Sequence, residues 1–207
     1  MSISTYDELK SAIADFLNRD DLTSVIPTFI SLAETSMKRS MRSWRMENRA
    51  TATLNSQYEA LPARFIAPIR LSITSGTTYE LTAISQSDMI DMRQKSNNVS
   101  SRPRYYSLTQ GELEFYPTPD GEYTLEMVYY EAPEALSDVV SSNWVLANFP
   151  DLYLYGSLLH SAPYLSDDGR TQIWSSLYQS ALEAVLLDEQ KAKYGGSGLR
   201  MKLRSFG

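Results

Sequence analysis

The 207-residue sequence contains no cysteine and a single histidine, His160. Without a thiol the chain can form no disulfide, and it offers neither a thiolate nucleophile nor a zinc–thiolate site. One histidine cannot supply a site of several imidazole ligands, and the H-E-x-x-H spacing of zinc hydrolases is not found. His160 lies beside the apolar stripe of a predicted helix, so we interpret it as a buried, hydrogen-bonded or interface side chain.

Long apolar runs are also missing. No stretch approaches the roughly 20 consecutive apolar residues that cross a bilayer, so no membrane partner is expected. The N-terminal sequence MSISTYDELK lacks a basic segment followed by an apolar one, so no signal peptide is expected either.

Motifs that carry chemistry are not found. The sequence has no P-loop, no dinucleotide-type glycine pattern and no G-x-S-x-G. Two carboxylate pairs exist. Glu112 and Glu114 are interpreted as the wet face of a half-buried strand, and Asp167 and Asp168 as residues at a helix start. The sequence therefore predicts no catalytic, cofactor or metal site, and a protein that is not an enzyme.

The formal charge is −6, yet basic residues cluster in 38–49, 93–104 and 200–204. An acidic chain has no general attraction for nucleic acid, because neutralising phosphates requires clustered Lys and Arg. The clusters are read first as solvated faces. A nucleic-acid-binding module stays open as an alternative because of them.

Amphipathic helices are predicted at both ends of the chain. Near the N-terminus they cover about 6–19 and 26–44, where apolar residues recur at intervals of three and four. Thr5 with Glu8 forms a capping-box pattern at the first helix. Toward the C-terminus one helix starts at Phe149-Pro150-Asp151 and a longer one covers about 170–193.

Between these helices the period of the apolar residues changes to two, which is typical of strands. The alternating segments are 48–54, 57–61, 69–74, 78–84, 104–109, 112–116 and 122–131. Turn residues such as Ser75-Gly76 and Gln110-Gly111 separate them and favour antiparallel hairpins. A short helix is predicted over about 86–94.

These signals predict an α+β protein: a four-helix bundle formed by the N- and C-terminal helix pairs, with an inserted antiparallel β-rich lobe. The predicted domains are a helical bundle over 1–46 and 144–194, a β-rich insertion over 47–143 and a flexible C-terminal tail over 195–207. The chain also has 14 tyrosines, an excess that weakly favours an assembling protein because Tyr is enriched at interfaces.

Four stretches carry a family resemblance. They are YDELKSAIADFLNRDDLTSVIPTFISLAE, EALPARFIAPIRLSI, GELEFYPTPDGEYTLEMVYYE and NWVLANFPDLYLYGSLLHSAPYLSDDGR. Together they resemble the head-to-tail adaptor proteins of short-tailed bacteriophages, which are similar to the tail tubular protein A group, over nearly the whole chain. These are packing and turn patterns rather than catalytic motifs.

The resemblance implies a structural protein of the virion neck that is assembled in the host cytoplasm. Such a protein forms a twelve-membered ring that joins the portal protein to the tail nozzle or tail fibres and continues the DNA channel. DNA then passes through the lumen during ejection without specific binding. Another tail-completion protein of the virion remains the main alternative.

The C-terminal sequence GGSGLRMKLRSFG is the most specific local hypothesis. Its pattern suits a strand added to the sheet edge of a partner, and the expected partner is the portal. The alternative reading is a frayed terminus. The candidate partner-binding residues are Leu199, Arg200, Met201, Lys202, Leu203, Arg204 and Phe206. For the ring itself, we expect the long C-terminal helix and the basic stretch 38–49 to contribute contacts.

Overall fold

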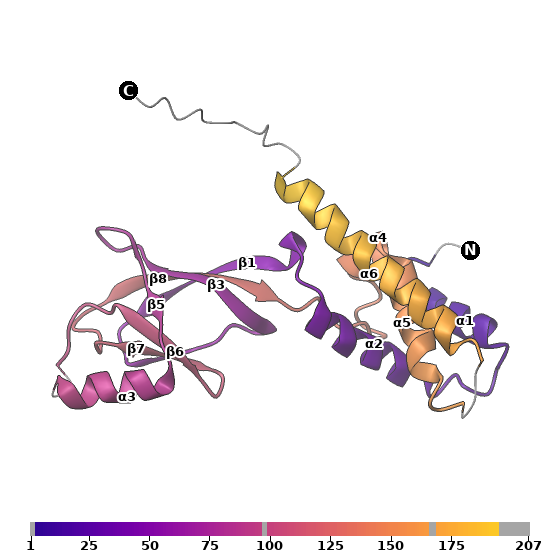
Figure 1. Cartoon of the computed structure of the whole chain (residues 1–207), viewed down its shortest axis with the longest axis horizontal. Helices are drawn as coiled ribbons and strands as arrows, with labels where there is room; N and C mark the ends of the chain where they lie inside the picture. Colours follow the sequence, from indigo (N-terminus) through magenta and orange to yellow (C-terminus); the bar gives the residue numbers. More distant parts are fainter. Residues whose placement is uncertain (1–2, 97–98, 166–168, 195–207) are drawn as a thin grey trace, which may run out of the picture. The chain divides into compact units, whose positions relative to one another are not determined.

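The chain forms two compact units in a computed structural model that describes residues 3–96, 99–165 and 169–194. The helical unit comprises the described residues of Met1–Trp44 and Pro133–Gly207, and the β unit comprises those of Arg45–Ala132. The chain leaves the helical unit once and returns to it once, so the β unit interrupts the helical unit in sequence (Figure 1).

Five α-helices form the described part of the helical unit. They are α1 (Tyr6–Leu17), α2 (Ile26–Ser40), α4 (Trp144–Asn148), α5 (Pro150–Ser161) and α6 (Thr171–Tyr194). The capping box predicted for α1 is confirmed, because the Thr5 hydroxyl accepts from the Glu8 N–H and the Glu8 carboxylate accepts from the Thr5 N–H. Asn18 ends α1 in the left-handed conformation, at φ 53°.

The predicted four-helix bundle with an inserted lobe is wrong. In the described helical unit α5 is the central helix, and α1, α2, α4 and α6 all pack against it. Buried residues cover most of the circumference of α5, including Leu152, Tyr153, Leu154 and Leu158, whereas a bundle helix would bury one stripe. The short helix α4 was not expected; Asn143 caps it by accepting from the N–H groups of Val145 and Leu146, each at 3.0 Å.

Gly156 explains how α5 holds two long helices closely. A Cβ atom at this position would lie 3.0 Å from the Tyr178 ring of α6 and 3.2 Å from the Cβ of Ala33 on α2. Glycine is therefore the residue that lets α2 and α6 approach α5 at the same level.

The described β unit contains eight strands and one helix. They are β1 (Glu47–Leu54), β2 (Tyr58–Ala60), β3 (Phe65–Ile73), β4 (Tyr79–Glu80), β5 (Thr82–Ala83), α3 (Gln86–Lys95), β6 (Tyr105–Thr109), β7 (Glu112–Tyr116) and β8 (Tyr123–Glu131). A 3₁₀ turn, η1 (Trp44–Met46), precedes β1. The strands make two four-stranded sheets, with orders β1-β8-β3-β4 and β2-β7-β6-β5.

Pairing in both sheets is antiparallel except between β5 and β6, which run parallel. The hairpin predicted at Gln110-Gly111 joins β6 to β7, and both turn residues have positive φ, as a two-residue type I′ turn requires. One apolar core is shared by the two sheets, with Leu71, Met127 and Tyr129 from the first and Leu113 and Phe115 from the second. The alternation read from the sequence supplies this core, because every second residue of β8 points into it.

Glu131 joins strand ends at the place where the chain enters and leaves the β unit. Its carboxylate accepts from the Asn48 amide at 2.8 Å and from the Arg64 guanidinium at 2.9 Å. β1 and β8 are direct neighbours from the Glu47–Tyr130 pair onward. The two chain connections of the β unit therefore lie side by side.

Candidate assembly surfaces

The candidate partner-binding residues 199–204 and 206 lie outside the described residues, and so does the carboxylate pair Asp167 and Asp168. The tail interaction therefore stays a prediction.

His160 of α5 is half-buried, and its Nε2 lies 3.0 Å from the Ser36 hydroxyl of α2. Burial lowers its pKa below the ordinary value, because the charged imidazolium loses solvation. The histidine thus links two packed helices, as the sequence interpretation expected.

A second polar link in the helical unit holds the returning segment at 133–143 against α2 and α5. The Glu34 carboxylate accepts from the Leu136 N–H at 2.8 Å and from the Tyr153 hydroxyl at 3.0 Å. The Asn143 amide donates to Tyr153 Oη and to the Glu134 carbonyl, both at 2.7 Å. Burial raises the pKa of Glu34, although the hydrogen bonds from the Leu136 N–H and the Tyr153 hydroxyl lower it.

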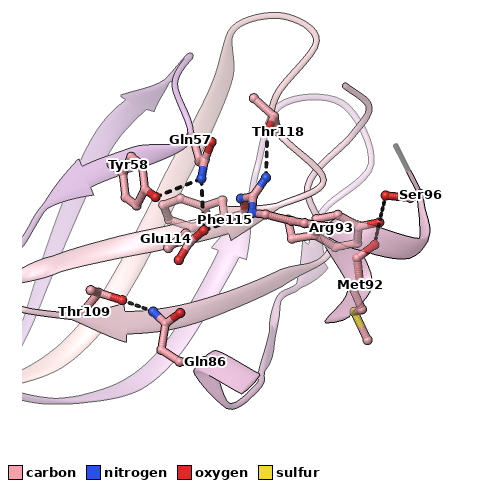
Figure 2. Close-up of polar contacts among 11 residues, drawn as sticks. Gln57, Tyr58, Gln86, Met92, Arg93, Ser96, Thr109, Glu114, Phe115 and Thr118 are labelled. Atoms are coloured by element: carbon pink, nitrogen blue, oxygen red, sulfur yellow. Dashed lines mark hydrogen bonds and ion pairs between the residues drawn. The ribbon is translucent and has the colours of Figure 1, made fainter. Parts of the chain in front are cut away.

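In the β unit the principal polar cluster lies between α3 and the sheet β2-β7-β6-β5 (Figure 2). Arg93 of α3 pairs with Glu114 of β7 at 3.0 Å and donates to the Phe115 carbonyl at 2.7 Å. Its guanidinium lies 5.5 Å from the centre of the Tyr116 ring. The Gln57 amide also donates to Glu114, at 3.0 Å.

Glu114 is therefore buried, and the interpretation of Glu112 and Glu114 as one wet face holds for Glu112 only. Both side chains point to the same side of β7, but α3 covers that side over Glu114. The Tyr116 hydroxyl strengthens the attachment of α3 by donating to the Met92 carbonyl, at 3.1 Å. No signal in the sequence marks this pair, because Arg93 falls in the basic cluster 93–104 and its partner Glu114 lies 21 residues away.

The basic clusters divide into paired and exposed residues. Arg49 pairs with Glu126 on the outer side of its sheet, as does Arg70, which lies outside the clusters, and the Arg93 side chain is mostly covered, at 14% exposed. Lys38 and Arg39 are exposed at the end of α2. The reading of these clusters as solvated faces is thus right for the α2 residues and wrong for Arg93.

Two helices of the helical unit, α6 and α2, expose apolar side chains to solvent. On α6 the side chains of Ile173 and Leu187 are 59% and 55% exposed, with Leu177 at 37%. On α2 Leu32 is 44% exposed, while the buried side of that helix faces α5. Exposed apolar residues that gather on one helix indicate a contact surface more strongly than scattered ones do.

A shallow pocket of about 380 Å³ lies in the β unit near β4 and β5, lined by Tyr79, Arg102, Arg104, Tyr105 and their neighbours. The Arg102 guanidinium covers the Tyr79 ring at 4.2 Å and donates to the Thr77 carbonyl. Elsewhere in the described ranges, no group of three or more His, Cys, Asp or Glu side chains is placed to hold a metal ion. None of the described helices combines the length and apolar character that crossing a bilayer requires.

The two units and their exposed helical faces define an α+β protein whose prominent surface features suit contacts with other proteins. The family model of the SU10 adaptor protein matches residues 4–202. The chain belongs to the SU10 adaptor protein family, which confirms the resemblance to phage head-to-tail adaptors seen in the sequence. Membership gives the chain a structural role as a phage adaptor. No curated protein matches the chain.

Proposed function

We propose that this adaptor forms a ring in the virion neck, connects the portal protein to the tail and continues the DNA channel. The observation that carries the proposal is the family match over residues 4–202. The exposed apolar residues on α6 and α2 support it, because a ring subunit must present complementary faces to its neighbours. The expected copy number is twelve, and the expected partners beyond the portal are the tail nozzle or tail fibres.

The net charge of −6 supports a lumen through which DNA slides. An acidic surface repels phosphates, so a ring of such subunits would not hold DNA that must pass. This argument favours the structural role over a nucleic-acid-binding module. Binding to duplex DNA that weakens steeply with added salt would favour the module instead.

Negative-stain imaging tests the ring directly. The full chain is mixed with the portal protein of the same phage, and we expect an additional ring of density on one face of the portal. Because the portal can serve as the template on which the ring assembles, a chain that is monomeric without portal is compatible with the proposal. Portals that stay bare at a large excess of the chain would contradict it.

The tail provides the second test of the proposed function. We infer that residues 195–207 dock onto the portal, because the alternating pattern from Leu199 to Leu203 suits strand addition. A chain shortened to residue 194 should lose portal binding while it keeps its helical circular dichroism. A truncated chain that binds the portal as well as the full chain would exclude the tail from the contact.

A further inference from the structure

The outer face of α6 carries little charge from Thr171 to Leu187. Between Thr171 and Leu187 the sequence has one charged residue, Glu183, and its side chain is exposed. At 100° per residue, Ile173, Leu177 and Leu187 fall on one side of the helix. This side differs from the side that packs on α5, which carries the buried residues Trp174, Tyr178, Ala181 and Val185. The exposed stripe spans about 21 Å.

The outer face of α2 has a similar character. Thr28, Leu32, Thr35 and Arg39 lie on one side, opposite the buried residues that face α5. The Thr35 hydroxyl already donates to the Ser31 carbonyl at 2.9 Å. Burying this face in a contact would therefore leave the Thr35 donor satisfied, and its desolvation cost would be small. The face spans about 17 Å, close to the length of the α6 stripe.

The charges at the two faces are opposite in sign. From Ile173 to Leu187 the α6 stripe carries one charge, the acid Glu183, and the exposed Asp188 and Lys191 follow on the same side in the next turn, so the acids outnumber the base. The outer face of α2 ends instead in the exposed bases Lys38 and Arg39. The third charged residue of α2, Glu34, directs its carboxylate to Leu136 and Tyr153 inside the helical unit. Two faces of similar length, each uncharged in its middle and with opposite net charge toward one end, complement one another.

We propose that, in the ring, the outer face of α6 of one copy packs against the outer face of α2 of the next copy. The inference rests on the proposed ring and specifies its contact. A closed ring needs a contact between two different faces of the same chain, because a contact of one face with itself ends at a dimer. The α6 and α2 faces supply such a pair, with apolar residues in the middle and an ion pair at the rim.

Cysteine cross-linking tests the contact cleanly, because the chain has no cysteine of its own. The full chain is prepared as Leu32→Cys, as Leu177→Cys and as the double variant, each bound to the portal and treated with a short bismaleimide. We expect a ladder of covalent oligomers from the double variant. An equal mixture of the two single variants should give dimers, and each single variant alone should stay monomeric.

A matched control uses Ile90→Cys on α3, where the replaced side chain is also exposed, at 52%. Mixed with Leu177→Cys, it should give no cross-link. Dimers from Leu177→Cys alone would show α6 facing α6 and would overturn the proposal. Rings visible on the portal without cross-links from the mixed single variants would also overturn it while leaving the proposed function intact. Bare portals with the wild-type chain would instead refute the proposed ring.

A charge exchange tests the rim of the same contact. Glu183→Arg and Arg39→Glu should each lower ring occupancy on the portal by about tenfold at low salt, because like charges then face each other. The chain that carries both substitutions should recover most of the occupancy, since every contact in the ring regains opposite charges. A double variant that assembles no better than the single ones would contradict the opposition of these two side chains.

Discussion

Each unit contains a carboxylate shielded from solvent, partly in the case of Glu34 and fully in the case of Glu114, and the two are satisfied in different ways. In the helical unit, the Glu34 carboxylate accepts from a backbone N–H and from the Tyr153 hydroxyl, which are neutral donors. In the β unit, the Glu114 carboxylate pairs with the Arg93 guanidinium and accepts from the Gln57 amide. The carboxylate of the helical unit thus fixes a returning chain segment, and that of the β unit fixes a helix to a sheet.

This difference indicates which kind of change, loss of a charge or a change of pH, should destabilise each unit. A buried ion pair leaves an uncompensated charge when one partner is removed, which costs about 3–5 kcal/mol. A carboxylate held by neutral donors can take up a proton instead, so its unit responds to pH. We therefore expect the β unit to be vulnerable to loss of a charge and the helical unit to changes in packing and pH.

The largest effect is expected from Arg93→Ala. It leaves the Glu114 carboxylate without its cation, with only the neutral Gln57 amide still donating, and it removes the Arg93 donor to the Phe115 carbonyl. We expect it to lower the free energy of unfolding of the β unit by about 3–5 kcal/mol. Hydrogen exchange of the backbone amides in 45–132 measures this loss of unfolding free energy. Tryptophan fluorescence should change little, because Trp44, Trp144 and Trp174 all belong to the helical unit.

Arg104→Ala is the matched control, because its side chain is exposed, and its effect should be close to zero. Replacing both partners by apolar residues, Arg93→Met with Glu114→Leu, should recover much of the stability. An Arg93→Ala loss no larger than that of the control would mean that the ion pair is not what stabilises the β unit.

Gly156→Ala tests the helical unit, which we expect to be sensitive to packing rather than to loss of a charge. The added methyl group would press on the Tyr178 ring and on Ala33, and it should destabilise the helical unit by about 1–3 kcal/mol. Urea unfolding followed by tryptophan fluorescence reports this loss. Gly169→Ala is the matched variant, because a Cβ there meets nothing within 4 Å; equal midpoints for the two variants would contradict the close packing at Gly156.

The smallest effect concerns pH and Glu34. Its pKa in the folded chain is raised above the ordinary value of 4.5, so the folded state holds this proton more strongly than the unfolded state does. The resulting stability is complete below pH 4.5 and is lost as the pH rises through the folded pKa.

Glu34→Gln keeps an oxygen acceptor for Leu136 and Tyr153 and carries no charge. We expect it to unfold with a flatter dependence on pH above pH 4.5 and to be at least as stable as the wild type near neutrality. Glu34→Ala removes the acceptor and should be less stable at every pH, by about 1–3 kcal/mol. If the free energy of unfolding depends on pH in the same way for Glu34→Gln and the wild type, the Glu34 carboxyl is not the source of that pH dependence.

Local rules predicted much of the fold. The capping box at Thr5, the change of period after α2 and the Gln110-Gly111 hairpin depend on neighbouring residues, and the structure contains all three. The bundle was wrong because α5 was read as a helix with one apolar stripe. Small residues such as Gly156 and Ser157 are buried on its remaining sides, and composition alone does not distinguish them from exposed ones.

The polar clusters were harder to predict because their members are far apart in the chain. Glu34 and Tyr153 are separated by 119 residues, and the burial of Glu114 depends on where α3 packs. The sequence predicts that the long C-terminal helix contributes to the ring contact, and this stays a prediction; which face of α6 remains open follows only from its packing on α5. The tail residues 199–204 and 206 keep their predicted role untested.

The hydrogen bonds from Asn48 and Arg64 to Glu131 have a consequence for the order in which the two units fold. In an unfolded chain, joining α2 to the segment at 133–143 closes a loop as long as the whole β unit, and each doubling of loop length costs about 0.6 kcal/mol. Once β1 and β8 have paired and Glu131 holds Asn48 and Arg64, the same two segments are tethered at neighbouring strand ends. Early formation of this pair would shorten the effective loop, so the β unit would lower the entropic barrier for the helices that flank it in sequence.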